Sequence, residues 1–247
     1  MDDGFVPTGS KPLFGGAMSC SFPSTGWIDI SDVRQVPDNQ ESFMEDSTLS
    51  GGRNPAQIVV EIVEYQRDVP NDRAVRFFWD NLLEDNKINP NDRNSSTFQE
   101  MPLIAAVPSS SLSPQPLPSQ QGTTVVPSLW TTYGQKKRDE SQSNTPTIRY
   151  GVGYQRIALG RDTNVDGHNR SGQQEVVCVV VNFAVIRLPQ QESEILISLS
   201  RPVPSHPNSG NEVHLPTMDN QNLDEMIHPV WSEVVTTLRV NEWSLFG

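Results

Sequence analysis

The chain has 247 residues, with 30 acidic and 18 basic side chains and a formal net charge of -12. This length is enough to bury a hydrophobic core, but only 35% of the residues are hydrophobic, which predicts that part of the chain stays unfolded. The acidic surplus argues against sequence-independent nucleic-acid binding, because phosphate contacts need clustered Lys and Arg. It suits a partner with a basic surface.

The cysteines and the apolar runs bear on the cellular compartment. Cys20 and Cys178 are too few for a disulfide framework, and Cys178 lies in an apolar run typical of a buried small hydrophobe. Asp2 and Asp3 make the start of the chain acidic, and no apolar stretch follows them, so we expect no signal peptide. No apolar run has the length of a membrane span. We therefore expect a protein of the nucleus and the cytoplasm, without membrane insertion.

The first part of the chain predicts short strands separated by turns. Polar and apolar side chains alternate up to Phe22, and residues 23–26 contain Pro, Ser, Thr and Gly, which is typical of a turn. Residues 27–34 predict the entry into one helical turn, with Ser31 or Asp29 as its N-cap. Residues 37–39 predict a further turn, which leads to a short strand near residues 42–44.

Two longer elements follow. Residues 58–65 are rich in β-branched side chains, which favours a strand, although a helix would place Glu61 and Glu64 on one face. Residues 71–83 predict a helix capped by Asn71 or Asp72. Its apolar side chains recur with a period near 3.6, at Val75, Phe78, Trp79, Leu82 and Leu83.

The composition changes between residues 107 and 147, where Pro and Ser recur. Such a segment does not recover its ordering entropy through burial, so we expect a largely disordered insertion, with a strand within residues 125–133 as its ordered part. Lys136, Lys137 and Arg138 form a basic triplet followed by two acidic residues. Solvated charge is a plainer interpretation of this triplet than a nuclear localisation signal.

The C-terminal part predicts strands at residues 152–159, 176–188 and 194–200, the last two joined as a hairpin across residues 189–191. A final helix is predicted over residues 223–238, and Pro229 either ends its first turns or marks its true start. The side chains expected on its buried face are Trp231, Val234, Val235 and Leu238.

An antiparallel sheet with helices laid on it makes an α+β domain. We assign the domain to residues 11–247, interrupted by the insertion at 107–147 and preceded by a disordered N-terminus at residues 1–10.

Motifs for catalysis or metal binding are weak. Residues 162–167 fit the first six positions of an EF-hand loop, but Asn169 and Gln173 replace its later apolar residue and its glutamate, so a polar loop is the better interpretation. The four histidines lack the spacing of zinc ligands. Gly151 and Gly153 are followed by Arg156, where a dinucleotide-binding loop needs glycine. We therefore predict no catalytic residue, no metal and no cofactor.

Several segments together resemble the Ran guanine nucleotide release factor family, the Mog-type Ran-binding proteins. Their order and rough spacing match the family, and the segment at residues 28–43 is the most specific. The Pro/Ser-rich stretch and the loop at residues 161–174 are longer than the family leads us to expect. The matching segments lie at residues 13–17, 28–43, 58–64, 187–190 and 244–247.

The resemblance implies a single domain with a central antiparallel sheet flanked by helices, a fold shared with the PsbP proteins. It further implies that the protein binds the small GTPase Ran, promotes release of its nucleotide and supports nuclear protein import, with no catalytic chemistry of its own. We expect the protein to be a monomer.

The resemblance also implies a Ran-binding surface. The two acidic residues of the family's binding segment correspond to Glu61 and Glu64. Asp29 or Asp32 would alternatively only cap a turn, and Asp38 would only shape one. The full candidate set is Glu61, Glu64, Asp38, Gln40, Glu41, Asp29, Asp32 and Arg34.

Two other interpretations are open. The first is a PsbP-like module with the same fold and no GTPase partner, against which the missing lumen-targeting segment counts. The second is a calcium-responsive adaptor that uses Asp162, Asn164 and Asp166, which a calcium titration by calorimetry would expose.

Overall fold

The computed structural model describes residues 8–48, 55–89, 91, 95–101, 124–125, 147–159, 175–203 and 226–246. Strand β1 (Thr8–Leu13) begins inside the N-terminal tail expected from the sequence. Strand β7 (Thr124–Val125) lies at the start of the strand expected within the insertion. The basic triplet and the EF-hand-like loop lie outside the described residues.

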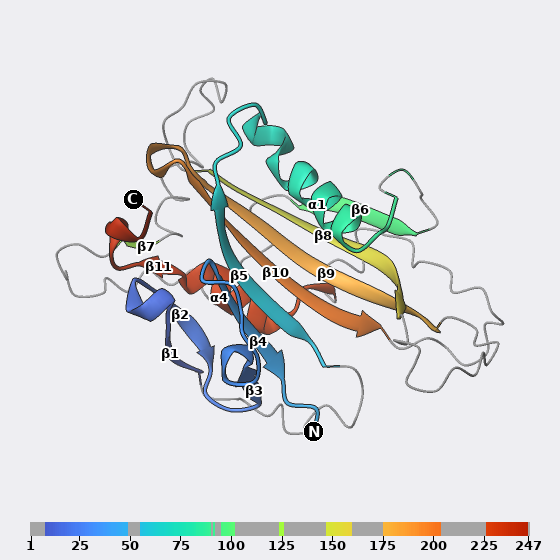
Figure 1. Ribbon diagram of the computed structural model, residues 1–247, viewed down its shortest axis with the longest axis horizontal. Helices are drawn as coiled ribbons and strands as arrows, with labels where there is room; N and C mark the ends of the chain where they lie inside the picture. The colour runs from blue at the N-terminus through green and yellow to red at the C-terminus, as the bar shows by residue number, and fades with distance from the viewer. Residues whose placement is uncertain are drawn as a thin grey trace.

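A seven-stranded antiparallel sheet forms the centre of the molecule (Figure 1). Its strand order is β3-β4-β5-β10-β9-β8-β6. In chain order, its strands are β3 (Trp27–Asp29), β4 (Gln40–Glu45), β5 (Gln57–Glu64), β6 (Ser96–Met101), β8 (Thr147–Leu159), β9 (Glu175–Leu188) and β10 (Ser193–Val203). The sheet and the two helices that cover it among the described residues confirm the α+β class.

Strand β5 confirms the strand expected at residues 58–65, and the alternative helix is wrong. Ile58 and Val60 are buried, whereas the alternate residues Gln57 and Val59 are half-buried. Tertiary pairing with β4 and β10 suits these β-branched side chains.

The expected hairpin of β9 and β10 is confirmed, with the 3-10 turn η5 (Pro189–Gln191) between the strands. Glu192 closes this turn in the left-handed conformation, at φ 48°. Residues 178–188 are buried without interruption, because both faces of the sheet are covered at β9.

Helix α1 (Ala74–Asp85) covers one face of the sheet, and the 3-10 turn η3 (Asn71–Arg73) precedes it. Of the expected apolar face, four side chains are buried and Leu82 is half-buried. The predicted caps are wrong: neither Asn71 nor Asp72 caps the helix, whose N-cap position is Arg73 and carries no side-chain cap. Asn71 instead accepts a hydrogen bond from Arg187.

Helix α4 (Pro229–Thr237) covers the opposite face (Figure 1). Pro229 occupies the first turn and His228 is the N-cap, so the later of the two expected helix starts is correct. The four side chains expected on its buried face are all buried. Trp231 anchors the helix to the sheet, because its indole Nε1 donates to the carbonyl of Ile197 at 3.2 Å.

A small sheet packs against α4, with strand order β1-β2-β11-β7. It contains β2 (Met18–Pro23), in which burial alternates as expected, and β11 (Arg239–Val240). The backbone N–H of Ser21 donates to Oγ1 of Thr237 at 2.8 Å and ties the small sheet to α4. The main core lies between the large sheet, α4 and this small sheet.

Both cysteines are free and buried, as expected for Cys178. Burial raises the pKa of Cys20 to about 12 and that of Cys178 to about 11, so both thiols stay protonated. Among the described helices, none has the length and hydrophobicity needed to cross a membrane.

Candidate functional site

The end of β5 gathers segments that are far apart in the sequence. The N–H of Ile62 donates to the carbonyl of Asn39, and the Asn39 side chain donates back to the Ile62 carbonyl, both at 2.9 Å. The N–H of Tyr65 donates to the carbonyl of Glu192 at 3.0 Å. The turn before β4, the end of β5 and the hairpin turn therefore lie together.

The N-terminal and C-terminal segments reach the same end. The N–H of Phe14, in the 3-10 turn η1 (Phe14–Gly16), donates to Oε1 of Glu41. Asn241 donates through its N–H to the carbonyl of Ala17 at 2.8 Å and through its side chain to the carbonyl of Gly16 at 2.9 Å. Ser244 and Phe246 lie beside Gln190 of the hairpin turn, so all five family-like segments have residues at or near this end of the sheet.

Glu61 lies on the face of the sheet that α1 partly covers. It faces Gln40 across the strand pair, and the Gln40 amide donates to Oε1 of Glu61 at 2.9 Å. Asn39 donates to the same oxygen at 3.4 Å. These amides hold the half-buried carboxylate in one orientation.

Glu64 lies on the opposite face, because residues three apart in a strand point to opposite sides. Glu64 is exposed and pairs with Ser193 of β10. Strand β4 begins opposite Glu61, so Glu64 lies beyond the paired part of β4 and β5. The structure therefore does not bring the two expected binding carboxylates onto one face. A partner reaches both only by meeting the end of β5.

The other predicted binding residues fall into two groups. Asp29 caps the 3-10 turn η2 (Ile30–Asp32), since its Oδ1 accepts the N–H of Ser31 at 3.1 Å, and it pairs with Lys11 at 3.1 Å. The expected Ser31 cap is wrong, and the helical turn is confined to η2 because residues 27–29 form β3. Burial alone would raise the pKa of Asp29, but these hydrogen bonds and Lys11 outweigh it and lower the pKa.

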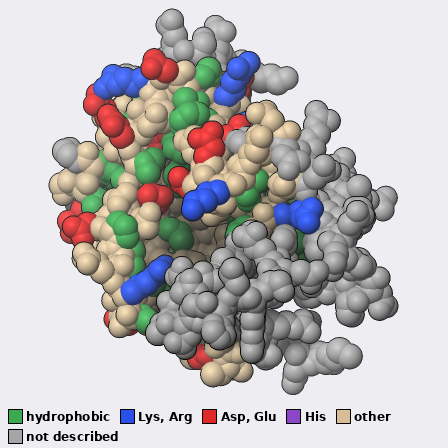
Figure 2. Space-filling view, turned by 45° about the vertical axis from the view of Figure 1, so that its right-hand side comes forward, with side chains coloured by type: hydrophobic (Ala, Val, Ile, Leu, Met, Phe, Trp, Pro, Cys, Tyr) green, Lys and Arg blue, Asp and Glu red, His purple; other side chains and the backbone are tan. Residues whose placement is uncertain are grey.

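Glu41, like Asp29, is engaged within the fold, since it accepts from Phe14. The remaining candidates lie at the surface: Gln40 is half-buried against Glu61, and the exposed ones are Asp32, Arg34 and Asp38. In Figure 2, acidic side chains are interspersed with hydrophobic ones on the face shown.

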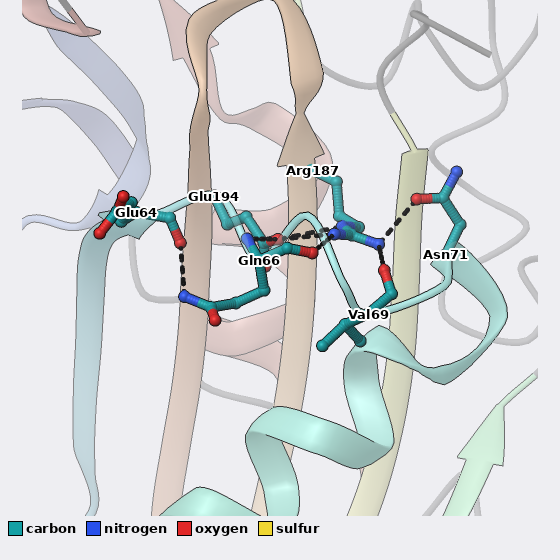
Figure 3. Close-up of polar contacts among 6 residues, drawn as sticks. All are labelled: Glu64, Gln66, Val69, Asn71, Arg187 and Glu194. Carbon is teal, nitrogen blue, oxygen red and sulfur yellow. Dashed lines mark hydrogen bonds and ion pairs between the residues drawn. The ribbon is translucent and has the colours of Figure 1, made fainter. Parts of the chain in front are cut away.

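Arg187 organises the loop that follows Glu64 (Figure 3). Its guanidinium donates to Oε1 of Glu194 at 3.0 Å, to the carbonyl of Gln66 at 2.6 Å and to the carbonyl of Val69 at 2.6 Å. It also donates to Oδ1 of Asn71 at 2.8 Å. Gln66 in turn donates from its side chain to the carbonyl of Glu64 at 3.0 Å, so the cluster fixes the end of β5.

The Arg187–Glu194 pair is almost fully buried, at 1% and 0% side-chain exposure. Burial raises the pKa of Glu194, although the N–H of Gln66 and the charge of Arg187 oppose this shift. Sequence reasoning used Arg187 only as part of a turn motif and missed Glu194 and Gln66. The available signal was a basic residue inside an apolar strand, with an acid across the predicted hairpin.

An open recess of about 570 Å³ lies beside the hairpin turn. Its walls come from the turn and from the 3-10 helix η6 (Trp243–Phe246), whose two aromatic rings lie 5.8 Å apart between centroids. It is lined by Gln190, Gln191, Glu192, Trp243, Ser244 and Phe246. Sequence reasoning did not identify the recess, although its matching segments included parts of both walls.

Within the described ranges, no group of three or more His, Cys, Asp or Glu side chains is arranged to hold a metal ion. The site provides aromatic rings, which are enriched in protein interfaces, and carboxylates and amides, which pair with basic groups of a partner.

Comparison with known proteins decides the family. The family model described as Ran-interacting Mog1 protein matches residues 11–202. The chain belongs to the Mog1 family. This confirms the resemblance seen in the sequence.

Relatives with this family's names differ in how much of the chain they match. The Ran guanine nucleotide release factor of Danio rerio is 39% identical over 106 residues, which are 43% of this chain and 51% of that protein. That of Bos taurus is 26% identical over 246 residues, or 98% of both chains. The nuclear import protein mog1 of Schizosaccharomyces pombe is 35% identical over 71 residues, which are 29% of this chain and 34% of that protein.

The fold agrees with a solved member of the family. The crystal structure of the Saccharomyces cerevisiae Ran-binding protein Mog1p superposes with a TM-score of 0.54 and covers 98% of this chain and 100% of that chain. At 19% sequence identity, this likeness shows a shared fold.

Proposed function

We propose that this protein binds the small GTPase Ran and promotes release of its guanine nucleotide, in support of nuclear protein import. The observation that carries the proposal is the pair of carboxylates at the end of β5, half-buried Glu61 and exposed Glu64, where the family-like segments meet. Family membership and the names of the relatives support the choice of Ran.

Nucleotide release follows from linkage. A factor releases nucleotide when it binds the empty GTPase more tightly than the loaded one, because each ligand then weakens the other. Carboxylates achieve this by pairing with basic groups that otherwise face phosphate, or by repelling phosphate itself. No bond is made or broken, so the protein acts without catalytic residues. In this proposal it acts as a monomer in the nucleus and the cytoplasm.

The positions of the two carboxylates give them different roles in binding. Glu61 is held by Gln40 and is pre-oriented, so it binds with little further loss of side-chain entropy. Glu64 is exposed, so its carboxylate is accessible to a basic side chain of a partner. Gln66 holds its backbone in place.

The test is release of a fluorescent GTP analogue from purified Ran. We expect the wild-type protein to accelerate release, and Glu61→Lys and Glu64→Lys each to reduce the acceleration by at least about tenfold, the scale of a charge pair turned into a repulsion. Glu84→Lys, at an exposed position of α1, is the matched control and should behave as wild type.

Circular dichroism and melting curves would confirm that the variants fold. Acceleration that survives both substitutions would reject this site. The absence of both release and Ran binding in the wild-type protein would reject the function.

A further inference from the structure

The recess beside the hairpin turn lies next to Glu64. Ser193, which directly follows Glu192 of the recess, pairs with Glu64 across β10 and β5. Trp243 and Phe246 pack against the core cluster on the side of the sheet where Ile62 also packs. Glu64 is two residues beyond Ile62 and shares its face. The recess and Glu64 therefore lie at neighbouring positions on one side of the sheet.

The lining of the recess combines aromatic rings with one acid. Trp243 and Phe246 are half-buried, with rings tilted at 43° to each other. Glu192 is the charged residue of the lining, and Gln190, Gln191 and Ser244 supply polar groups. A side chain with an aliphatic stem and a cationic head matches this lining. Its stem packs on the aromatic rings, and its charge interacts with a ring face and with the carboxylate.

Glu192 has two features that fit a binding role. It is a non-glycine residue in the left-handed region, a conformation that costs free energy and clusters at binding sites. Its carboxylate pairs with Arg67, but both side chains are about two-thirds exposed, at 67% and 68%, so the pair is weak and exchanges readily. The Arg67 contact shows that a guanidinium reaches this carboxylate.

We propose that this recess anchors a Lys or Arg side chain of the GTPase partner, with its stem over Trp243 and Phe246 and its charge paired with Glu192. The proposal rests on the proposed function and adds a second anchor to it. Charge complementarity favours this occupant, since the chain carries a net charge of -12 and Glu64 lies beside the recess.

Two substitutions separate the aromatic and the acidic contributions. Glu192→Asn removes the charge while keeping a residue that tolerates the left-handed conformation. Trp243→Leu keeps an apolar side chain against the core and removes the indole face. We expect Trp243→Leu to raise the Kd for Ran about 5- to 30-fold, the range of a partly to fully desolvated cation–π contact. Glu192→Asn should raise it by up to about 5-fold, the scale of an exposed ion pair. Glu84→Gln, which removes one charge from the exposed face of α1, should leave the Kd unchanged.

The Kd is measured by calorimetry on full-length chains, with Ran in the nucleotide state that the wild-type protein binds best. A second measurement follows the indole N–H resonance of Trp243, identified by its loss in Trp243→Leu, during titration with Ran. Weaker binding of both variants together with movement of this resonance supports the anchor.

A stationary indole resonance would overturn the anchor, and so would wild-type affinity in both variants. If Glu64→Lys still abolishes binding in that case, the anchor fails while the proposed function stands. If the wild-type chain binds no Ran in any nucleotide state, both fail together.

Discussion

At the scale of single residues, the buried pair of Arg187 and Glu194 makes the sharpest prediction for stability. Arg187→Met keeps the volume but leaves the Glu194 carboxylate buried without its cation and removes the donor to the carbonyls of Gln66 and Val69. We expect a loss of about 3–5 kcal/mol in the free energy of unfolding, measured by urea denaturation. The double variant with Glu194→Gln should recover part of it. A single variant as stable as wild type would show that the cluster is dispensable.

His228 makes the prediction for pH. Its Nδ1 accepts the N–H of Val230 at 3.2 Å, and burial lowers the pKa of His228 from 6.5 to about 4. Because the unfolded chain then binds the proton more readily, the stability from neutral His228 is complete above about pH 6.5 and is lost as the pH falls towards about 4. The loss should be about 3 kcal/mol, because lowering a pKa by one unit corresponds to about 1.4 kcal/mol.

His228→Asn keeps an N-cap without titrating, so its melting temperature should fall less over this pH range. Melting curves of the two proteins at matched pH values make the comparison. Parallel falls of both melting temperatures would contradict a role for His228.

At the scale of elements, the contact of α1 with the sheet depends on a glycine. A Cβ on Gly153 of β8 would lie 2.3 Å from the indole of Trp79 and 2.7 Å from the backbone oxygen of Thr97. Gly153→Ala should therefore destabilise the fold by about 1–3 kcal/mol, the usual cost of overpacking. Gly9→Ala, where nothing lies within 4 Å, is the control. Equal unfolding midpoints for the two variants would disprove this close approach.

At the scale of the whole molecule, the excess of acidic groups predicts how the protein meets its partner. A chain of net charge -12 should bind a basic surface at a rate that falls as salt increases, because screening weakens long-range attraction. Stopped-flow mixing with Ran at increasing ionic strength measures this dependence. Glu64→Lys should lower both the association rate and its sensitivity to salt, whereas a rate indifferent to salt would rule out electrostatic steering.

The sequence by itself determined the features that depend on neighbouring residues. The β-branched run of β5, the hairpin of β9 and β10 and the buried face of α4 follow from local periodicity and turn residues, and the family followed from matching segments. Local pattern was insufficient at Asn71, which was expected to cap α1 and instead binds Arg187.

Only the tertiary structure decided how the distant segments meet. Strand pairing placed Glu64 opposite Ser193, and packing brought η6 beside the hairpin turn. These contacts join residues that lie far apart in the sequence. They depend on which strands pair and on what covers each face, because neither pairing nor covering is encoded in any short window of sequence.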